Sequence, residues 1–539
     1  MTGRVVDALV VGAGFAGLRS LHTLRERGYD VAVVEANDDI GGVWYVNRYP
    51  GARCDVESYD YSLSFSPELE QEWRWSERYA TQPEILRYVE HVAQRFDLRR
   101  DVHLSTRMER AEFDETTGRW RVDTDRGTWD ARYLVMATGQ LSVRAAPGIP
   151  GADDFAGTTL HTADWPHEGA DLSGKRVGVI GTGSSGTQLI PVVAREAAHL
   201  TVFQRTPNFS VPANNGPIDD ARDAEVKAGY ADRRERARRS PSGLGFVPNK
   251  QSALEVSDDE RRALYEEQWR TAGFGFLLAY YDLMLDQEAN DTAADFVRAK
   301  IAEKVDDPAT AEKLMPRGHP FGAKRPPVDS GYFETFNRDD VDLVDLRETP
   351  IERITPTGVR TTAGEVGLDV LVFATGFDAM TGALLRPEIA GRGGETLREH
   401  WDAGPRTYLG VGVAGFPNLF VIAGPGSPSL LSNVLLSIEA HVDWLADLLD
   451  HARDRGATVV EADPGAEARW VEQVNARAEA TLYPRADSYY MGTNVPGKPR
   501  VFTPYVGGVR GYRRILESVV ADGYDGFLLS GKGRDVRAS

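Results

Sequence analysis

Cysteine is nearly absent from this chain, which has only Cys54 among its 539 residues. A single cysteine excludes an internal disulfide and a Cys-x-x-Cys redox centre, so the chain is not a disulfide reductase. Scarce cysteine also fits a reducing compartment, and we expect a cytoplasmic protein. No basic segment with an apolar core precedes the first expected strand, so no secretory signal is expected.

The chain also has fewer positively than negatively charged residues, and it has no long apolar runs. Asp and Glu number 81 against 62 for Lys and Arg, which gives a net charge of −19. Nucleic acids and anionic membranes bind basic patches, so neither is expected as a partner. No apolar run approaches the length that crosses a bilayer. The length and the hydrophobic share of 41% indicate a globular chain of two or three domains. A monomer is the expected state.

Two glycine-rich turns each follow a short apolar strand. Residues 7–11 lead into Gly12-Ala13-Gly14-Phe15-Ala16-Gly17, and residues 177–180 lead into Gly181-Thr182-Gly183-Ser184-Ser185-Gly186. In such turns the first glycine permits a tight bend, the second lets the backbone approach a pyrophosphate, and the third packs the helix on the sheet. The following helix N-terminus offers free N–H groups to the phosphates. The pair predicts an α/β fold with two Rossmann-like dinucleotide-binding domains.

The ends of the next strands distinguish the two nucleotides. In each unit the residue at that position faces the adenosine ribose. Glu35 in the first unit suits ribose hydroxyls and repels a 2′-phosphate, whereas Gln204 and Arg205 in the second unit suit a 2′-phosphate. We therefore expect FAD at the first turn and NADPH at the second.

Composition suggests how the chain is divided. A Pro/Gly-rich linker lies at 147–151, and a polar, charged stretch from about 213 reads as helices inserted into the second nucleotide domain. Charge runs there, such as 233–239, are expected to be solvated helix faces. His441, on a later helix pattern, is expected to be a packing or surface residue. The expected parts are 1–140 and 379–539 for the FAD domain, the latter with substrate loops, 141–212 and 324–378 for the NADP domain, and 213–323 for the helical insertion.

Local patterns predict several elements. Residues 81–96 read as a helix, and 120–122 and 132–136 as strands. Ser257 has capping-box spacing to Glu260 ahead of another helix. The small-residue turns at 137–139 and 374–376 each follow a strand and are expected to approach a cofactor.

Two longer fingerprints carry a family resemblance. One is Phe155-x-Gly157-x3-His161-x3-Trp165-Pro166, between the two turns, and the other is Gly41-Gly42-x-Trp44-x4-Tyr49-Pro50-Gly51-x3-Asp55. With both turns, they make the chain resemble the type I Baeyer–Villiger monooxygenases, the class B flavoprotein monooxygenases, over essentially its whole length. Within that family it is most similar to the phenylacetone and steroid monooxygenase group.

The resemblance implies an enzyme and a mechanism. NADPH would reduce FAD, and one oxygen atom of O2 would be inserted next to a ketone carbonyl through a flavin peroxide and a tetrahedral adduct, giving an ester or lactone. By the family pattern Arg325 supplies a fixed positive charge beside the peroxide, and Asp55 holds that arginine. An arginine suits this role because it stays protonated.

The resemblance also implies binding residues. Those implied for NADPH are Thr182, Gly183, Ser184, Ser185, Gln188, Arg205, Thr206 and Lys324. Other implied cofactor contacts are Gly12, Gly14, Phe15, Gly17, Glu35, Gly42, Val43, Trp44, Asp55, Tyr61, Ala137, Thr138, Gly139, Gln140, Arg325, Ala374, Thr375, Gly376 and Tyr489. Ser429 and Leu430 lie where relatives shape the substrate pocket. The fingerprint residues Phe155, Gly157, His161, Trp165 and Pro166 are expected to couple the two domains during cofactor movement. No second ligand lies at a suitable spacing from His161, so no metal is expected.

One position departs from the family pattern. Tyr489 stands where many relatives carry a tryptophan that touches the nucleotide. A tyrosine still donates a hydrogen bond, but from a shorter body. Retention of NADP⁺ and the shape of the pocket are the properties this change would affect.

Two alternatives remain open at this point. A flavin monooxygenase acting on nitrogen or sulfur would share both turns but usually lacks the Trp-Pro that ends the first fingerprint. A non-catalytic flavin or NADP(H) sensor would not need Arg325 and Asp55, and it would consume little NADPH.

Overall fold

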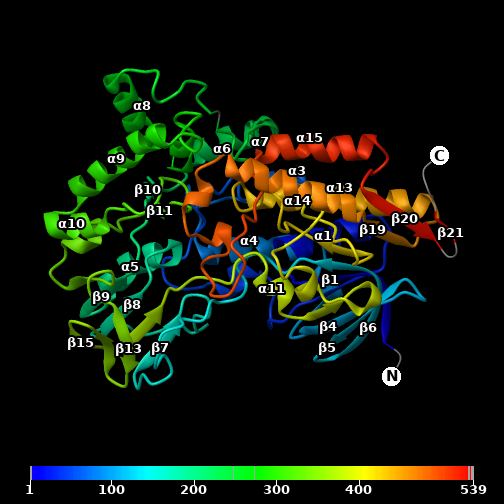
Figure 1. Cartoon of the computed structure of the whole chain (residues 1–539), viewed down its shortest axis with the longest axis horizontal. Helices are drawn as coiled ribbons and strands as arrows, with labels where there is room; N and C mark the ends of the chain where they lie inside the picture. Colours follow the sequence, from blue (N-terminus) through cyan, green and yellow to red (C-terminus); the bar gives the residue numbers. More distant parts are fainter. Residues whose placement is uncertain (1–2, 247, 272, 532–533, 536–539) are drawn as a thin grey trace.

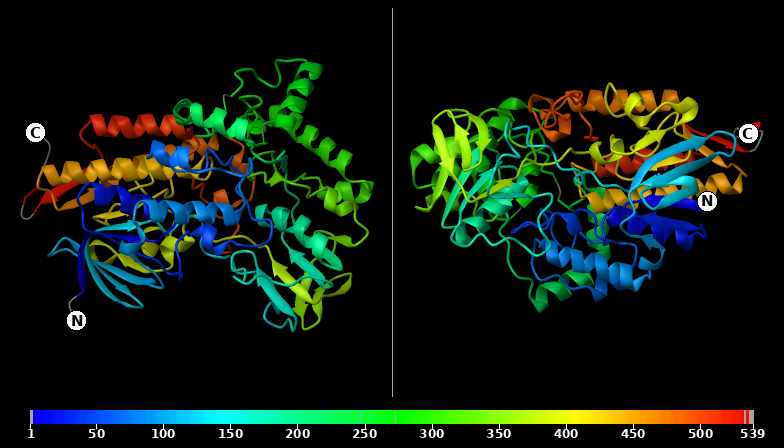
Figure 2. Two further views of the ribbon diagram at one scale, coloured as in Figure 1. Left: turned by 180° about the vertical axis from the view of Figure 1, so that it is seen from behind. Right: turned by 90° about the horizontal axis from the view of Figure 1, so that it is seen from below.

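Two sheets form the centre of the molecule. The computed structural model describes residues 3–246, 248–271, 273–531 and 534–535. In Figure 1 one sheet lies at the lower right and the other at the lower left. From behind and from below, the two sheets again lie on opposite sides of the molecule (Figure 2). This confirms the predicted α/β class.

The first sheet joins strands from both ends of the chain. Its order is β17-β4-β5-β6-β1-β2-β3, and β18 pairs with β6. The parallel centre is β6-β1-β2, with Leu9 and Val10 of β1 fully buried between neighbouring strands. The strands are β1 (Arg4–Val11), β2 (Val31–Val34), β3 (Val102–His103), β4 (Met108–Asp114), β5 (Arg119–Thr124), β6 (Gly127–Met136), β17 (Glu388–Ala390) and β18 (Leu419–Val421).

Helices cover this first sheet. Helix α1 (Phe15–Glu26) follows the first glycine turn and packs against the long helix α13 (Val434–Asp454), where Arg19 pairs with Asp443 at 2.5 Å. Helix α4 (Gln82–Arg95) buries Ile85, Tyr88 and Val89, as its apolar spacing predicts. The other helices of this part are α2 (Val43–Val46), α3 (Pro67–Glu72), α11 (Gly382–Leu385), α12 (Leu397–His400), α14 (Pro464–Glu479) and α15 (Gly508–Ala521).

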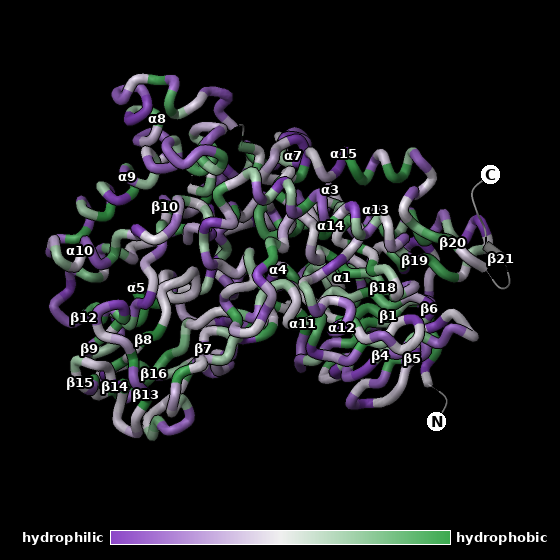
Figure 3. Tube along the Cα trace, viewed as in Figure 1, coloured by the Kyte–Doolittle hydropathy of each residue, from purple (hydrophilic) through white to green (hydrophobic). Residues whose placement is uncertain are grey.

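The second sheet is parallel throughout. Its order is β12-β9-β8-β16-β7, and helix α5 (Ser184–Glu196) follows the second glycine turn. The strands are β7 (Thr158–His161), β8 (Arg176–Ile180), β9 (His199–Gln204), β12 (Val341–Asp345) and β16 (Val370–Phe373). A small antiparallel sheet of β13 (Ile351–Thr355), β14 (Gly358–Thr361) and β15 (Gly364–Gly367) lies beside it. Hydropathy is highest along the central strands of both sheets (Figure 3).

The segment between β9 and β12 is mainly helical. It holds α6 (Asp220–Ala228), α7 (Tyr230–Arg239), α8 (Asp258–Thr271), α9 (Gln287–Lys304) and α10 (Pro308–Leu314), with β10 (Val211–Pro212) paired to β11 (Val328–Asp329). The predicted capping box is present: Glu260 N donates to Ser257 Oγ at 3.3 Å, and Ser257 N donates to the Glu260 carboxylate at 3.0 Å. This reciprocal pair explains why α8 begins at Asp258.

One prediction for this segment is wrong in part, although Glu235, Arg236 and Arg239 are exposed as expected. Residues 233–239 were expected to form a solvated face, but the Arg233 side chain is 18% exposed and that of Arg234 is 5% exposed. Both pair with acidic residues of the N-terminal part, which the chain's local pattern does not reveal.

The remaining elements are short or terminal. They are the three-residue to six-residue 3-10 helices η1 (Arg99–Asp101), η2 (Gly273–Leu278), η3 (Glu334–Asn337), η4 (Arg392–Gly394), η5 (Tyr483–Arg485) and η6 (Tyr489–Met491), and the strands β19 (Val459–Ala462), β20 (Phe527–Gly531) and β21 (Arg534–Asp535). Across the described residues, no helix combines the length and apolar character that crossing a membrane requires.

Candidate active site

The two glycine turns have the same backbone geometry. Gly12 and Gly181 have φ values of 105° and 112°, which strain any L side chain. A Cβ added to Gly12 would lie 2.7 Å from the carbonyl oxygen of Ala137, and one added to Gly181 would lie 2.4 Å from that of Ala374. Each turn therefore packs against the small residue that follows a neighbouring strand, β6 in one unit and β16 in the other.

The third glycines pack inside the turns. A Cβ on Gly17 would lie 1.7 Å from the carbonyl oxygen of Gly12, and one on Gly186 would lie 2.2 Å from that of Gly181. Gly17 was expected to contact the cofactor, but it is not among the residues that line the cavity described below. Its place behind the turn allows α1 to start close to the strand.

Both helix starts suit an anion. Helices α1 and α5 begin after Gly14 and Gly183, and neither end carries a side-chain cap. Uncapped N–H groups and the helix dipole together favour a phosphate. A Cβ on Gly183 would meet no heavy atom of the described chain within 4 Å, so the space in front of this turn is open to a ligand.

A single cavity of about 1170 Å³ joins the two turns. Pockets for one small ligand usually measure about 300–1,000 Å³, so this cavity suits more than one. Every predicted cofactor or substrate residue except Gly17 lines it, namely Gly12, Gly14, Phe15, Glu35, Gly42, Val43, Trp44, Asp55, Tyr61, Ala137, Thr138, Gly139, Gln140, Thr182, Gly183, Ser184, Ser185, Gln188, Arg205, Thr206, Lys324, Arg325, Ala374, Thr375, Gly376, Ser429, Leu430 and Tyr489. The fold thus gathers residues spread over almost the whole sequence.

Glu35 lies at the end of β2 on the first unit's side of the cavity. Its carboxylate accepts hydrogen bonds from Ala13 N at 2.6 Å and from Asn37 N at 2.9 Å. The residue is 5% exposed. These bonds hold a buried negative charge at the strand end that faces a nucleotide ribose, which disfavours a 2′-phosphate and suits the ribose hydroxyl groups.

Arg205 and Lys324 bring positive charge to the second unit's side. The pKa of Lys324 is lowered by burial and by the nearby Arg205 cation. Two cations that face one cavity favour an anionic ligand. Asn208, which the sequence reasoning missed, lines the same region, and its buried Oδ1 has no partner among the described residues. The donor set fits a nucleotide with an extra phosphate.

Arg325 and Asp55 form a salt bridge with two hydrogen bonds in the cavity wall. Arg325 Nε donates to Asp55 Oδ2 at 2.7 Å and Nη2 donates to Oδ1 at 3.0 Å, while Nη1 donates to the Leu430 carbonyl at 2.9 Å. The Phe274 ring covers the guanidinium at 4.3 Å. Burial would lower the pKa of Arg325, but Asp55 outweighs it and holds that pKa well above its usual value.

An apolar cluster adjoins this ion pair. It is formed by Met380, Leu430, Tyr490, Met491 and Phe502, with Tyr483 and Tyr489 packed against it. Burial raises the pKa of Tyr489 well above its usual value, so its hydroxyl stays a donor. Of the residues named here, Leu430 and Tyr489 line the cavity, so these two present apolar and aromatic surface to it beside Arg325.

Ser429 is held in a buried hydrogen-bond cluster. Gln140 Nε2 contacts both the Ser429 hydroxyl and the Ala423 carbonyl, and Ser427 Oγ donates to Ser429 Oγ at 2.9 Å. Ser429 is 2% exposed. Its hydroxyl is thus engaged by the protein, which leaves Leu430 as the residue of this pair that faces the apolar cluster.

Gln188 connects the two nucleotide units. Its Oε1 accepts from Tyr49 OH at 2.8 Å, and its Nε2 donates to the Arg53 carbonyl at 3.0 Å. A Cβ on Gly51 would lie 2.4 Å from the Gln188 carbonyl oxygen, so this loop lies directly on α5. Gln188 lines the cavity, but its amide is already bonded to the loop that precedes Asp55.

The first fingerprint lies behind the cavity. None of Phe155, Gly157, His161, Trp165 and Pro166 is among the lining residues. His161 ends β7, accepts a hydrogen bond from Ala163 N at 3.0 Å, and lies 3.3 Å from the hydroxyl of Thr375, which does line the cavity. Burial and Arg144 lower the pKa of His161. The fingerprint can therefore influence the cavity only through its wall.

Several lining residues were not predicted. They include Asn47, Asn208 and Asn494, each with a buried Oδ1 that has no partner within the described ranges. Asn208 follows the predicted Thr206 by two positions, so extending the pattern beyond the strand end would have found it. Phe274, which covers Arg325 but is not among the lining residues, has no such signal in the sequence.

The chain has close relatives among known proteins. A family model described as pyridine nucleotide-disulphide oxidoreductase matches residues 9–217. A Baeyer-Villiger monooxygenase from Pseudooceanicola batsensis is 44% identical over 531 residues, covering 98% of this chain and 96% of the relative. A phenazine N-monooxygenase from Lysobacter antibioticus is 44% identical over 530 residues, covering 97% of each chain.

The fold is also found in solved structures. An oxidized steroid monooxygenase bound to NADP is 56% identical, with a TM-score of 0.94, and the match covers 98% of this chain and 99% of that one. The two nucleotide turns, the cavity and the Arg325–Asp55 pair are thus found within a fold shared along nearly the whole length of these proteins.

Proposed function

This chain belongs to the type I Baeyer–Villiger monooxygenase family, and from that premise we propose that it inserts one oxygen atom of O2 next to a ketone carbonyl, giving an ester or lactone. It is an NADPH-dependent flavin monooxygenase. The observation that carries the proposal is the Arg325–Asp55 pair, which lies in the wall of a cavity shared by two dinucleotide turns.

FAD, reduced by NADPH, supplies the activated oxygen. FAD fits the first unit, where the uncapped start of α1 faces the cavity and Glu35 suits ribose hydroxyls. NADPH fits the second unit, where Arg205 and Lys324 suit a 2′-phosphate and the start of α5 suits the pyrophosphate. The remaining lining residues predicted from the sequence are proposed to orient these two groups.

Arg325 is proposed to stabilise negative charge on the reacting oxygen atoms. Its guanidinium makes three hydrogen bonds to the described protein, two to Asp55 and one to the Leu430 carbonyl. A guanidinium carries five N–H donors, so donors remain for a group in the cavity. Because Asp55 keeps the arginine oriented, little reorganisation is needed when charge develops.

The ketone is proposed to lie between Arg325 and the apolar cluster around Leu430. Leu430 and Tyr489, which line the cavity, would contact the body of the ketone, while the arginine faces its carbonyl. The first fingerprint, including His161 and Trp165, is proposed to couple the two nucleotide units through the cavity wall. The domain limits predicted from the sequence, a cytoplasmic location and a monomeric state are part of the same proposal.

Oxygenation of nitrogen is the second candidate. The observation in its favour is that a phenazine N-monooxygenase is as similar to this chain as the Baeyer-Villiger relative, at 44% identity. The same cavity could present an amine nitrogen to activated oxygen. An N-oxygenation would not form a carbonyl adduct, so it would depend less on the positive charge of Arg325.

The test is a labelled-oxygen assay. The purified yellow protein is incubated with NADPH, isotopically labelled O2 and a panel of aryl, cyclic, long-chain and steroid ketones, and mass spectrometry follows the products. One labelled oxygen atom in an ester or lactone is the expected result. Labelled N-oxides from a matched amine panel, with no ester from any ketone, would favour the second candidate instead.

A further inference from the structure

Segment 55–62 lies between the cavity and helices α6 and α7. Asp55, Val56 and Tyr61 of this segment line the cavity, where Tyr61 OH accepts a hydrogen bond from Trp44 Nε1 at 2.9 Å. Glu57 and Asp60 are not among the lining residues. The Asp60 and Tyr61 amides both donate to the Glu57 carbonyl at 2.9 Å, so the segment forms a tight turn. Whatever holds the turn therefore also sets the position of Asp55.

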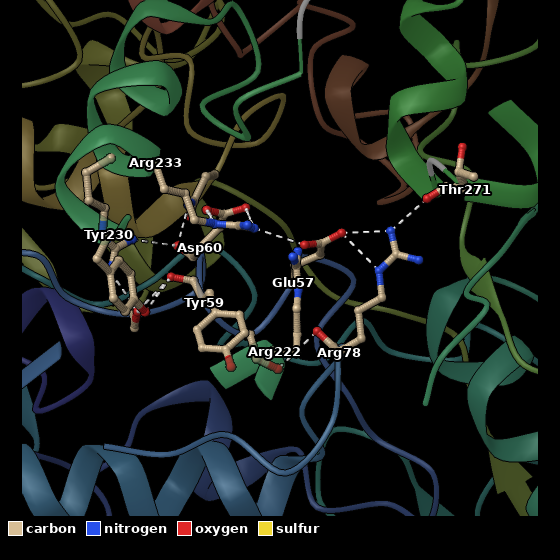
Figure 4. Close-up of polar contacts among 12 residues, drawn as sticks. Glu57, Tyr59, Asp60, Arg78, Arg222, Tyr230, Arg233 and Thr271 are labelled. Atoms are coloured by element: carbon tan, nitrogen blue, oxygen red, sulfur yellow. Dashed lines mark hydrogen bonds and ion pairs between the residues drawn. The ribbon is translucent and has the colours of Figure 1, made fainter. Parts of the chain in front are cut away.

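Arg233 of α7 binds this turn on the side away from the cavity. Its Nε and Nη2 donate to the two carboxylate oxygens of Asp60 at 2.7 and 2.6 Å, and Nη2 also donates to Glu57 at 2.9 Å. Figure 4 shows the Arg233 guanidinium beside Asp60, with a dashed line to Glu57. The Asp60 side chain is only 4% exposed, so this charge is compensated within the protein. Because one planar guanidinium binds both Asp60 and Glu57, these two carboxylates have little freedom to move.

Neighbouring residues of α7 hold the same turn. Tyr230 OH donates to the Tyr59 carbonyl at 3.0 Å, and Arg234 donates to Ser62 Oγ at 2.7 Å. Thus α7 contacts the turn through side chains on both sides of Asp60. The predicted solvated helix is instead packed against the segment that begins at Asp55.

Arg78 extends the network to the other side of Arg325. It donates to Glu57 at 2.9 and 2.7 Å and to the Thr271 carbonyl, at the end of α8, at 2.8 Å (Figure 4). The next residue, Tyr79, lies where a Cβ on Gly273 would come within 2.5 Å of its hydroxyl. Arg78 therefore contacts the end of α8, and Tyr79 OH lies close to Gly273, the first residue of η2, which carries Phe274.

The network therefore reaches both partners of Arg325. Asp55 begins the turn held by Arg233, and Phe274, whose ring covers Arg325 at 4.3 Å, follows the helix end held by Arg78. Glu57 lies between the two arginines and binds both. Each arginine thus binds a segment that lies within a few residues of one partner of Arg325.

We infer that Arg233 and Arg78, bridged by Glu57, are positioning residues that hold Asp55 and Phe274 against Arg325. The inference rests on the proposed function, because Arg325 is the group whose position matters. A geometry error of about 1 Å at a reacting centre can cost up to about 100-fold in rate, so a modest shift of Asp55 is enough to be measured.

The first experiment compares Arg233→Met with Arg119→Met in the purified holoenzyme. Arg119 is a matched control: its side chain is 21% exposed, it pairs with Asp130, and it is not among the cavity residues. We expect Arg233→Met to keep flavin reduction by NADPH but to give about tenfold less ester per NADPH consumed. Hydrogen–deuterium exchange at the amides of 57–61 should accelerate. Arg119→Met should change neither measurement.

Arg78→Met and Asp55→Asn complete the test. Arg78→Met should also lower ester per NADPH, and it should accelerate exchange in 273–278 as well as in 57–61. If Arg233 acts through Asp55, the Arg233→Met and Asp55→Asn losses should be less than multiplicative in the double variant. Fully multiplicative losses, or unchanged ester yield in Arg233→Met despite faster exchange, would overturn the inference.

A more conservative variant of Arg233 keeps the inference testable if Arg233→Met folds poorly. Should Arg233→Met not yield folded protein, Arg233→Lys keeps the charge but cannot form the two-pronged contact with Asp60. It should show a smaller loss of ester yield in the same direction, and a wild-type yield would again overturn the inference. If the wild-type enzyme forms no ester, that result counts against the proposed function instead, because the ester yield of each variant is measured relative to the wild-type yield.

Discussion

The Arg325 guanidinium and the Asp55 carboxylate are joined by two hydrogen bonds, at 2.7 and 3.0 Å, across 270 positions of sequence. This two-pronged contact fixes the plane of the guanidinium as well as its distance. The third bond, from Nη1 to the Leu430 carbonyl, connects the same group to the edge of the apolar cluster. Arg325, which follows the predicted helical insertion 213–323, thus contacts both the first nucleotide unit, through Asp55, and the proposed ketone site, through Leu430.

Replacing Arg325 should separate the two half-reactions. Arg325→Ala removes the positive charge proposed to face the reacting oxygen atoms, so ester formation should fall by about 100- to 1,000-fold. Reduction of the flavin by NADPH should continue, because it does not need this charge. Stopped-flow absorbance measures the reduction, and product analysis measures the ester. Near-normal ester formation would remove Arg325 from the mechanism.

Arg205 should discriminate between the two nicotinamide coenzymes. A charge-assisted hydrogen bond contributes about 1.5–3 kcal/mol, so Arg205→Ala should weaken NADPH by roughly tenfold to 100-fold. NADH lacks the 2′-phosphate and should bind almost as before. The KM for each coenzyme in flavin reduction gives the comparison, and equal weakening of both would contradict the assignment.

Two glycines of the second turn should respond differently to the same substitution. A Cβ on Gly186 would lie 2.2 Å from the Gly181 carbonyl oxygen, whereas one on Gly183 meets no described heavy atom within 4 Å. Gly186→Ala should therefore lower the free energy of unfolding by about 1–3 kcal/mol and impair NADPH use. Gly183→Ala should fold normally and lose only NADPH affinity. Thermal unfolding and NADPH titration together distinguish these cases.

His441 should make stability depend on pH. The side chain is fully buried, accepts a hydrogen bond from Ala423 N at 3.1 Å and lies 2.7 Å from Tyr512 OH, and burial lowers its pKa from 6.5 to about 3. Between these values the unfolded chain binds a proton that the folded chain does not. The contribution of neutral His441 is therefore complete above pH 6.5 and is lost as the pH falls toward 3.

The corresponding experiment compares His441→Gln with wild type in urea at several pH values from neutral to mildly acidic. Wild-type stability should fall more steeply with acid, by about 1.4 kcal/mol per pH unit, because the variant lacks this titrating group. His167→Gln, at an exposed histidine, is the control. Parallel pH profiles for wild type and His441→Gln would show that His441 is not the source of the slope.

Local patterns predicted much of the site. Three kinds of feature depend on residues only a few positions apart: the glycine turns, the acidic and basic strand ends, and the capping box at Ser257. They can therefore be recognised in the sequence itself. Arg325 and Asp55 were selected only through the family resemblance. No pattern near Arg325 reveals a carboxylate 270 positions earlier.

Other features could not be predicted from local order. The run 233–239 has almost no apolar spacing, which is typical of a solvated helix, yet Arg234 is buried, Arg233 is largely shielded from solvent, and both pair with acidic residues more than 150 positions away. Gly17 resembles its neighbours in the turn but lies behind it, because the backbone folds its Cα against the Gly12 carbonyl. His441 gains its partners from Tyr512 and Ala423, on separate elements.

The sequence by itself determined the two nucleotide units, their opposite charge preferences and the family, since these depend on short stretches whose geometry is local. Tertiary structure decided which charges are buried, which glycine faces the cavity and how Arg325 is held on both sides. The physical reason is that the pKa, exposure and orientation of a side chain depend on atoms brought close by folding, and the partners of Arg325 and Arg233 lie in distant parts of the chain.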